Sequence, residues 1–166
     1  MSGPRARVIE TARLTLLPLR VEHAEEMAGV LGDPALHAFI GGVPHTPQEL
    51  RARYERLTAG SPDPSVTWLN WVIRLRAEDR LMGTVQATVT ADATEIAWVV
   101  ATDRQGGGVA SEAARALVEW LDGEQVGPVI AHIHPDHAAS AAVARRAGLA
   151  PTDRMWDGEI RWARRA

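Results

Sequence analysis

A single α/β (α+β) domain is predicted, with a mixed, mostly antiparallel sheet of about six to seven strands and helices on both faces. Three features of the sequence indicate this fold. Short runs of alternating apolar and polar residues recur along the chain, which is typical of half-buried strands. Longer runs carry apolar residues at helical spacing. One of these connects the strand candidates 95–101 and 129–134, and a helix-length connection indicates a parallel crossover.

The composition is that of an ordinary globular protein. The chain has 166 residues, 46% hydrophobic and 23% charged, which suits one domain over residues 1–166. All 18 basic residues are arginine, and the formal net charge is −3, so no overall attraction to nucleic acid is expected. The absence of cysteine excludes a thiolate nucleophile and a cysteine metal site. With no apolar run near the roughly 20 residues of a membrane span and no signal peptide, we expect a cytoplasmic protein without a membrane partner.

The N-terminal part predicts one strand and two helices. Residues 1–12 are polar and irregular, and we expect them to be loosely held. Residues 13–19 alternate as a strand, and residues 21–31 form a helix that ends at Gly32. A second helix begins after Thr46, where Pro47 takes the first helical position and Glu49 completes a capping box.

The rest of the chain predicts most of the sheet. Two strands joined by a short hairpin connection at 77–80 are followed by a third, which together form an antiparallel meander. Two helices are then expected, over residues 110–122 and 138–147. The predicted strands of this part are 68–76, 81–90, 95–101, 129–134 and 159–164.

A glycine-rich loop, Arg104 to Ala110, lies between the strand 95–101 and the helix 110–122. Three successive glycines allow the backbone to approach a ligand, and amides at a helix N-terminus bind anions. The loop therefore indicates a phosphate or pyrophosphate site, although a plain flexible turn would have the same composition. It is not a P-loop, because the chain has no lysine, and its spacing does not fit the dinucleotide fingerprint.

The pattern Gln-x-x-Gly-x-Ala, here Gln105, Gly108 and Ala110, resembles the acyl-CoA loop of the GCN5-related N-acetyltransferases (GNAT superfamily). The segment from His134 to Ser140, followed by Arg145-Arg146-Ala147-Gly148-Leu149, is similar to the second signature of that family. Residues 11–19 look like the first strand of its ribosomal-protein N-terminal acetyltransferase branch. The resemblance implies transfer of an acetyl or other short acyl group from acetyl-CoA to a primary amine of a protein N-terminus or small molecule.

The resemblance also implies which residues bind the acyl carrier. Main-chain atoms of Val99 and Val100 would bond the pantetheine arm. Histidine stands at His137 where the family usually has asparagine, and glycine at Gly107 where it often has a basic residue. The amides implied to hold the pyrophosphate are those of Gln105, Gly106, Gly107, Gly108, Val109 and Ala110.

The candidate catalytic residues lie within or next to the two motifs. Ser140 falls on the serine whose hydroxyl is implied to donate to the departing sulfur, although a local helix-turn hydrogen bond is an equal alternative. His132 and His134 share one face of their strand, and His132 is the candidate base. Glu95 could act instead through a water. The three histidines at 132, 134 and 137 are also an alternative metal site. No carboxylate or thiol pattern supports it, so no metal is expected.

The acceptor pocket is expected between the first two helices and the sheet. Phe39 and the apolar residue after it must bury against something, and the resemblance makes their segment a wall of the pocket. Trp71 and Gln86 belong to adjacent strands and are candidate substrate-binding residues, although a large aromatic residue is more often part of the core. Trp98 stands where this branch often has an aromatic residue flanking the CoA cleft.

The sequence is also compatible with two other functions. The chain could be a CoA-binding or sensing module without turnover, because of His137 and the uncertain base. It could also take its acyl group from a donor such as aminoacyl-tRNA, but the net negative charge disfavours nucleic acid. A homodimer is compatible with the sequence, which does not identify the acceptor.

Overall fold

A computed structural model describes residues 3–37 and 42–164 of the chain, so Phe39 lies outside the described residues. The elements, in chain order, are β1 (Ile9–Glu10), β2 (Leu14–Pro18), η1 (Val21–His23), α1 (Ala24–Val30), η2 (Pro34–Leu36), α3 (Pro47–Ala59), β3 (Thr67–Leu75), β4 (Arg80–Val89), β5 (Thr94–Val100), η3 (Thr102–Arg104), α4 (Val109–Gly123), β6 (Val129–Ile133), α5 (Ala138–Arg146), β7 (Leu149–Trp156) and β8 (Glu159–Arg164).

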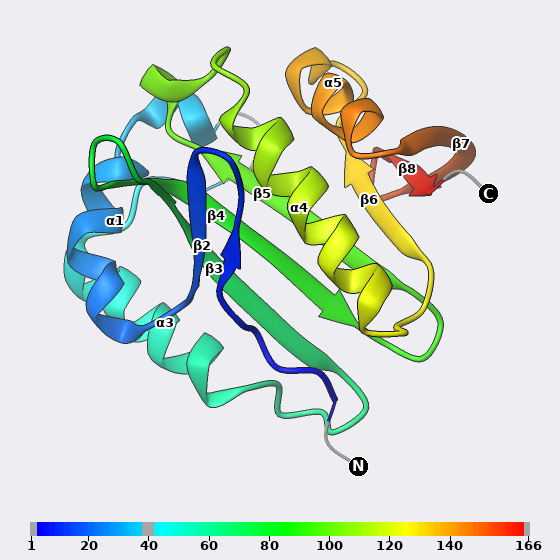
Figure 1. Cartoon of the computed structure of the whole chain (residues 1–166), viewed down its shortest axis with the longest axis horizontal. Coiled ribbons are helices and arrows are strands. Elements are labelled where there is room, and N and C mark those ends of the chain that lie inside the picture. The colour runs from blue at the N-terminus through cyan, green and yellow to red at the C-terminus, as the bar shows by residue number, and fades with distance from the viewer. Residues whose placement is uncertain (1–2, 38–41, 165–166) are drawn as a thin grey trace.

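The strands form one mixed sheet of eight strands in the order β1-β2-β3-β4-β5-β6-β8-β7 (Figure 1). Strands β5 and β6 pair in parallel, while the other neighbouring strands pair antiparallel. The predicted mixed sheet, its meander and the crossover through α4 are therefore confirmed. The sheet has two strands that the sequence analysis did not assign, β1 and β7.

Strand β7 was missed although a strong hairpin signal follows it. Asp157 and Gly158 join β7 to β8 with φ values of 48° and 80°. Two successive positive φ angles are the mark of a type I′ turn, which Asp-Gly favours. The strand itself is an edge strand with mostly exposed residues and a break in its register between Pro151 and Met155, so its hydrophobic alternation is weak.

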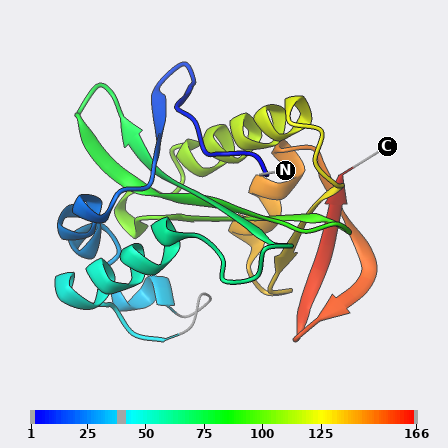
Figure 2. The ribbon, with the colours of Figure 1, turned by 90° about the horizontal axis from the view of Figure 1, so that it is seen from below.

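Helices cover both faces of the sheet (Figure 2). On one face α4 and α5 pack on a core that includes Leu117, Leu121 and Val143. On the other face α1 and α3 pack through Met27, Leu50 and other residues against strands β3 and β4. Among the described residues, no helix combines the length and the apolar character that crossing a bilayer requires.

The start of α3 forms as the sequence predicts. The amide of Glu49 donates to Thr46 Oγ1 at 3.1 Å, and the amide of Thr46 donates to Glu49 Oε1 at 2.9 Å. With Pro47 in the first turn, this is the expected capping box. The helix thereby begins at a fixed point and presents Leu50 and Tyr54 to the sheet.

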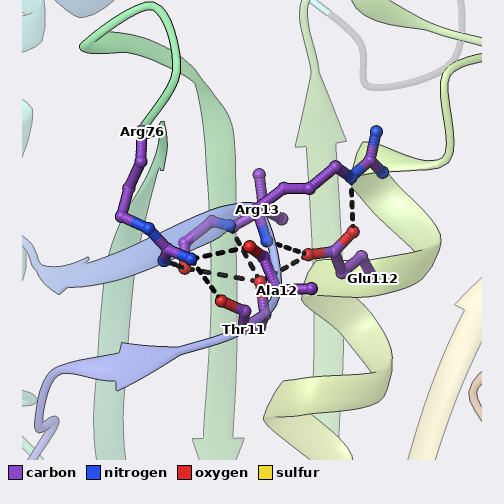
Figure 3. Close-up of polar contacts among 6 residues, drawn as sticks. Thr11, Ala12, Arg13, Arg76 and Glu112 are labelled. Atoms are coloured by element: carbon purple, nitrogen blue, oxygen red, sulfur yellow. Dashed lines mark hydrogen bonds and ion pairs between the residues drawn. The ribbon is translucent and has the colours of Figure 1, made fainter.

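Residues 3–12, the described part of the segment 1–12, are held more firmly than the sequence suggested. Strand β1 pairs with β2, and the turn that joins them lies against the first turn of α4 (Figure 3). Glu112 of α4 accepts hydrogen bonds from Thr11 Oγ1 at 2.5 Å, from the Arg13 amide at 3.0 Å and from Arg13 Nε at 2.8 Å. Long-range polar contacts of this kind leave no local pattern in the sequence, which is why the ordered turn was not foreseen.

Arg76 holds the same turn from the other side. Its guanidinium donates to the carbonyls of Thr11 at 2.6 Å and Ala12 at 2.8 Å, and to the carbonyl of Leu14. The planar fork of an arginine can serve several carbonyls at once, which a lysine cannot do in the same geometry. The turn is therefore fixed between the end of β3 and the N-terminal turn of α4 (Figure 3).

Replacing Glu112 with alanine is expected to lower the free energy of unfolding by about 2 kcal/mol, because charge-assisted hydrogen bonds to a partly buried carboxylate are lost. Burial raises the pKa of Glu112, but the hydrogen bonds from Thr11 and Arg13 outweigh it and the net pKa is lowered. This stabilisation is present above the pKa of the unfolded chain and is lost as the pH falls through the folded value. Urea unfolding at pH 7 and at acidic pH measures both effects.

Glu119→Ala is the matched control, because Glu119 lies on the same helix and forms an exposed ion pair with Arg115 at 3.5 Å. Its loss should cost less than about 0.5 kcal/mol. Equal effects of the two substitutions, or an effect of Glu112→Ala that does not shrink in acid, would contradict the role of Glu112.

Candidate functional site

A cavity of about 500 Å³ lies on the face of the sheet that carries α1 and α3, and extends past β5 and β6 to the start of α5. Several of the residues that the sequence analysis selected from distant parts of the chain border it. They are Trp71, Gln86, Glu95, Val99, His132, His137 and Ser140. The glycine loop and Val100 do not line this cavity, and the Val100 side chain is buried.

Strands β5 and β6 separate beside the cavity. Their parallel pairing consists of Thr94 with Val129 and Glu95 with Ile130, at the beginning of both strands. Beyond Glu95 the register does not continue, so the main chain of β5 towards Val99 and Val100 has no ladder partner on the β6 side. An opening of this kind between parallel strands leaves backbone donors and acceptors for a ligand.

Gly83 of β4 allows β4 to lie close to the Val99–Val100 segment of β5. It pairs with Val100 across the β4–β5 ladder. A Cβ at Gly83 would lie 2.0 Å from the Val99 carbonyl oxygen and 2.9 Å from Val100 Cα, so only glycine allows this approach. The position of the Val99–Val100 backbone therefore depends on a residue of the neighbouring strand.

The glycine loop has the backbone geometry of an anion site. Gly106 and Gly108 have φ values of 88° and 82°, and Gly108 is the N-cap of α4. No side chain caps the helix, and the first amides of a helix have no intrahelical partner. A Cβ at Gly106 would meet no atom within 4 Å, and one at Gly107 only the Arg104 carbonyl at 3.8 Å. The loop is thus open to a ligand and has the positive end of the helix dipole behind it.

Gln105 has a contact within the chain. Its side-chain Nε2 donates to the Val100 carbonyl at 3.1 Å, which ties the loop to the end of β5. The family resemblance implied a role only for the main-chain amide of this residue. Its side chain fixes the distance between the loop and the splayed part of β5.

His132 has a polar neighbour at each ring nitrogen. Its Nε2 accepts a hydrogen bond from Arg161 Nε at 3.1 Å, so the proton of the neutral ring lies on Nδ1. Nδ1 lies 3.0 Å from Glu95 Oε2, but the contact is not aligned as a hydrogen bond. The His132 side chain is 5% exposed, whereas that of Glu95 is 49% exposed. Of this pair, the carboxylate is the group that a molecule in the cavity mouth can reach.

Ser140 and His137 lie together at the start of α5. Ser140 Oγ is 3.4 Å from His137 Nε2. His137 occupies the N-cap position, but its side chain does not cap the helix. Burial lowers the pKa of His137, and the nearby His134 lowers it further. His137 is therefore neutral at pH 7 and can hydrogen-bond the Ser140 hydroxyl.

Trp71 has the contacts of a core residue. Its side chain is fully buried, and its indole N–H donates to the Arg7 carbonyl at 2.7 Å. The ring meets that of Trp120 of α4 edge to face, with centroids 5.4 Å apart. Trp71 borders the cavity, but its ring packs towards α4 on the opposite face of the sheet. Gln86 differs, because its strand position places it on the cavity face.

The structure adds residues that the sequence analysis did not select. Tyr54 of α3 borders the cavity and is 3% exposed, and its hydroxyl has no hydrogen-bond partner among the described residues. Burial raises the pKa of Tyr54 to about 12. Asn70 lies opposite Gln86 in the β3–β4 ladder and also borders the cavity. Tyr54 is the only tyrosine of the chain, and no sequence motif marks it as a site residue.

Residues 3–37 and 42–164 contain no group of three or more histidine, aspartate or glutamate side chains placed to hold a metal ion. His132 contacts Glu95 and Arg161, His134 accepts a hydrogen bond from the Asp136 amide, and His137 contacts Ser140.

Comparison with known proteins identifies the family. Residues 13–150 match the family described as acetyltransferase (GNAT) domain. No curated protein matches the chain by sequence.

Solved structures have the same fold. The ribosomal-protein-S5-alanine acetyltransferase from Vibrio fischeri superposes with a TM-score of 0.79 at 16% identity, covering 95% of this chain and 96% of that chain. RimL, a ribosomal L7/L12 alpha-N-protein acetyltransferase in complex with coenzyme A, gives 0.76 at 16% identity, with coverages of 95% and 96%. AAC(6')-Ib in complex with paromomycin and acetyl-CoA gives 0.75 at 18% identity, with coverages of 92% and 93%.

At these identities the structural similarity concerns the fold, which agrees with the family match over most of the sequence. The chain therefore belongs to the GNAT acetyltransferase family.

Proposed function

We propose that the protein transfers an acetyl group from acetyl-CoA to a primary amine of a protein N-terminus or a small molecule. The observation that carries the proposal is the junction of β5 and α4, where an uncapped helix N-terminus and a glycine loop adjoin a strand that has separated from its parallel neighbour. The loop suits the pyrophosphate, and the splayed strand suits the pantetheine arm. Two of the fold neighbours were solved with CoA or acetyl-CoA, which supports the choice of carrier.

In this proposal, acetyl-CoA supplies the acetyl group as an activated thioester. The amides of residues 105–110 hold the pyrophosphate, and Val99 and Val100 offer main-chain hydrogen bonds to the pantetheine. An amide of this strand segment polarises the thioester carbonyl, because preorganised donors stabilise the charge that develops there. The new N–C bond forms as the C–S bond breaks.

The acceptor amine must lose a proton, and Glu95 is the proposed base, acting through a water at the cavity mouth. His132 serves Glu95 as a positioning residue, since its Nε2 is occupied by Arg161 and its Nδ1 faces the carboxylate. The Ser140 hydroxyl donates a hydrogen bond to the departing sulfur. The thiolate then takes up a proton from solvent, and Glu95 releases to solvent the proton that it took from the amine. The number of protons is therefore unchanged over one reaction cycle.

Calorimetric titration with CoA tests the binding half of the proposal. We expect one site per chain and a loss of affinity of about tenfold or more in Gly108→Val, because φ is 82° at this position and a β-branched residue strains there. The control is Gly60→Ala, which also replaces a glycine with positive φ but at the end of α3. A wild-type protein that does not bind CoA would refute the proposal.

An acetyl-transfer assay tests the catalytic half. Release of free thiol from acetyl-CoA is followed with a panel of short peptides, amino sugars and alkylamines. Turnover with any of these amines supports the proposal. Tight CoA binding without thiol release against the whole panel would instead indicate a binding or sensing module.

A further inference from the structure

Trp156 is an exposed aromatic residue held beside the cavity. It ends β7, immediately before the tight Asp157-Gly158 turn, and is 64% exposed. Its ring centroid lies 6.5 Å from that of His132, which borders the cavity. The face of a tryptophan ring attracts cations, so an exposed tryptophan next to a cavity is a candidate ligand contact.

The strand register places Trp156 on the same face of the sheet as the cavity. Trp156 pairs with Glu159, and Arg161, two residues further along β8, pairs with His132. Residues directly opposite each other in a ladder share a face, as do residues two apart on one strand. Trp156, Glu159, Arg161 and His132 therefore form one row, and His132 contacts Glu95. Met155 pairs with Ile160 and lies on the other face.

The carboxylates in and beside this row favour a cation. The carboxylates of Glu95 and Glu159 border the cavity, and Glu95 is half exposed. The cation of the row, Arg161, is directed at the imidazole of His132. A tryptophan face attracts an ammonium or guanidinium group, and nearby carboxylates strengthen this attraction. The row thus has the components of a cation site next to the place proposed for acetyl transfer.

We propose that Trp156, with Glu159, forms an outer acceptor subsite that binds a second, positively charged group of the acceptor. The inference rests on the proposed function and deepens it, because it selects acceptors that carry a cation besides the amine that reacts. The cation can be a lysine or arginine side chain near a peptide N-terminus, or a further amine of a small molecule. Both sources share the chemistry that Trp156 recognises.

The first test measures binding without acetyl-CoA, so it does not depend on turnover. The indole N–H resonances of the protein, assigned by comparison with Trp156→Phe, are followed by NMR during titration with 1,5-diaminopentane and with 1-aminopentane. We expect the diamine to shift the Trp156 resonance at a concentration about threefold to tenfold lower than the monoamine does. Equal responses to the two amines, or no shift of the Trp156 resonance, would overturn the proposal.

The second test measures specificity during turnover. The tripeptide Ser-Lys-Ala is compared with Ser-Gln-Ala, and the diamine with the monoamine, in wild type and in three variants. We expect kcat/KM to favour the cationic member of at least one pair about threefold to tenfold, with the preference lost in Trp156→Ala and largely kept in Trp156→Phe. The pair that shows the preference identifies the source of the cation.

Met155→Ala is the matched control, because Met155 is 58% exposed on the same strand but lies on the opposite face. It should leave the preference unchanged, and a loss in Met155→Ala equal to that in Trp156→Ala would contradict the subsite. The KM for acetyl-CoA should not change in any of these variants. NMR binding without any acetyl transfer would support the cation subsite while refuting the proposed function.

Discussion

Replacing Gly83 with alanine is expected to destabilise the fold by about 3 kcal/mol, which is at the upper end for overpacking a core. The new Cβ would lie 2.0 Å from the Val99 carbonyl oxygen, and backbone atoms of a neighbouring strand cannot rotate away as a flexible side chain can. Strands β4 and β5 must then move apart at Gly83 and Val100. In a protein of this size, thermal unfolding should shift down by about 10 °C.

The same change should also impair binding of the acyl carrier. The displaced atoms belong to Val99 and Val100, which we propose as main-chain ligands of the pantetheine arm. Among Gly83→Ala molecules that remain folded, the affinity for CoA measured by calorimetry at low temperature should fall about tenfold or more. An affinity equal to that of the wild type would show that this stretch of β5 does not contact the carrier.

Gly29→Ala is the control for the Gly83 experiment. Gly29 lies in α1, and a Cβ there would meet no atom within 4 Å. Because alanine is the better helix former, the substitution should be neutral or stabilising by up to about 1 kcal/mol. Destabilisation of similar size in both variants would mean that steric contact with β5 is not the cause.

Replacing Ser140 with alanine is expected to lower kcat for acetyl transfer about tenfold to hundredfold, because a positioned donor to a leaving group contributes at this scale. The KM for acetyl-CoA should change little. Ser140 Oγ is 3.4 Å from His137 Nε2, a long contact whose loss should hardly affect stability. Steady-state kinetics and thermal unfolding of the same preparation separate the two effects.

Ser65→Ala serves as the comparison for Ser140→Ala, because Ser65 donates to Asp63 in an exposed turn far along the chain from the proposed site. It should leave kcat unchanged. If Ser140→Ala also retains kcat within about twofold, Ser140 has only the local helix-turn role that the sequence left open. A loss of stability in place of activity would lead to the same conclusion.

The organisation around the glycine loop could be predicted from the sequence because its signals are local. The alternating residues of β5, three glycines and the apolar stripe of α4 follow one another within about 30 residues, a typical length for such a unit. Helix capping at Thr46 is likewise local, since donor and acceptor are three residues apart. The family, the mixed sheet and the parallel crossover could be predicted because each is marked by sequence patterns between residues that are near one another in the chain.

The tertiary structure decided which side chains meet. His132 looked available as a base, but Arg161 from β8 occupies its Nε2, a contact across 29 positions that no spacing reveals. The sequence predicts Trp71 beside Gln86 as a pocket residue, yet its ring meets that of Trp120 edge to face, towards the other face of the sheet. Neighbouring strands can be recognised from sequence, whereas the direction of a large side chain depends on what packs against it.

The sequence by itself therefore determined the family, the order of the main elements and the loop that suits a phosphate. Only the tertiary structure decided that Gly83 sets the path of Val99, that Glu112 and Arg76 order the N-terminal turn, and that Trp156 lies beside His132. The physical reason is the range of the interactions. Propensity and capping act between near neighbours, while ladder register, steric contact and ion pairing join residues that the chain brings together only when it folds.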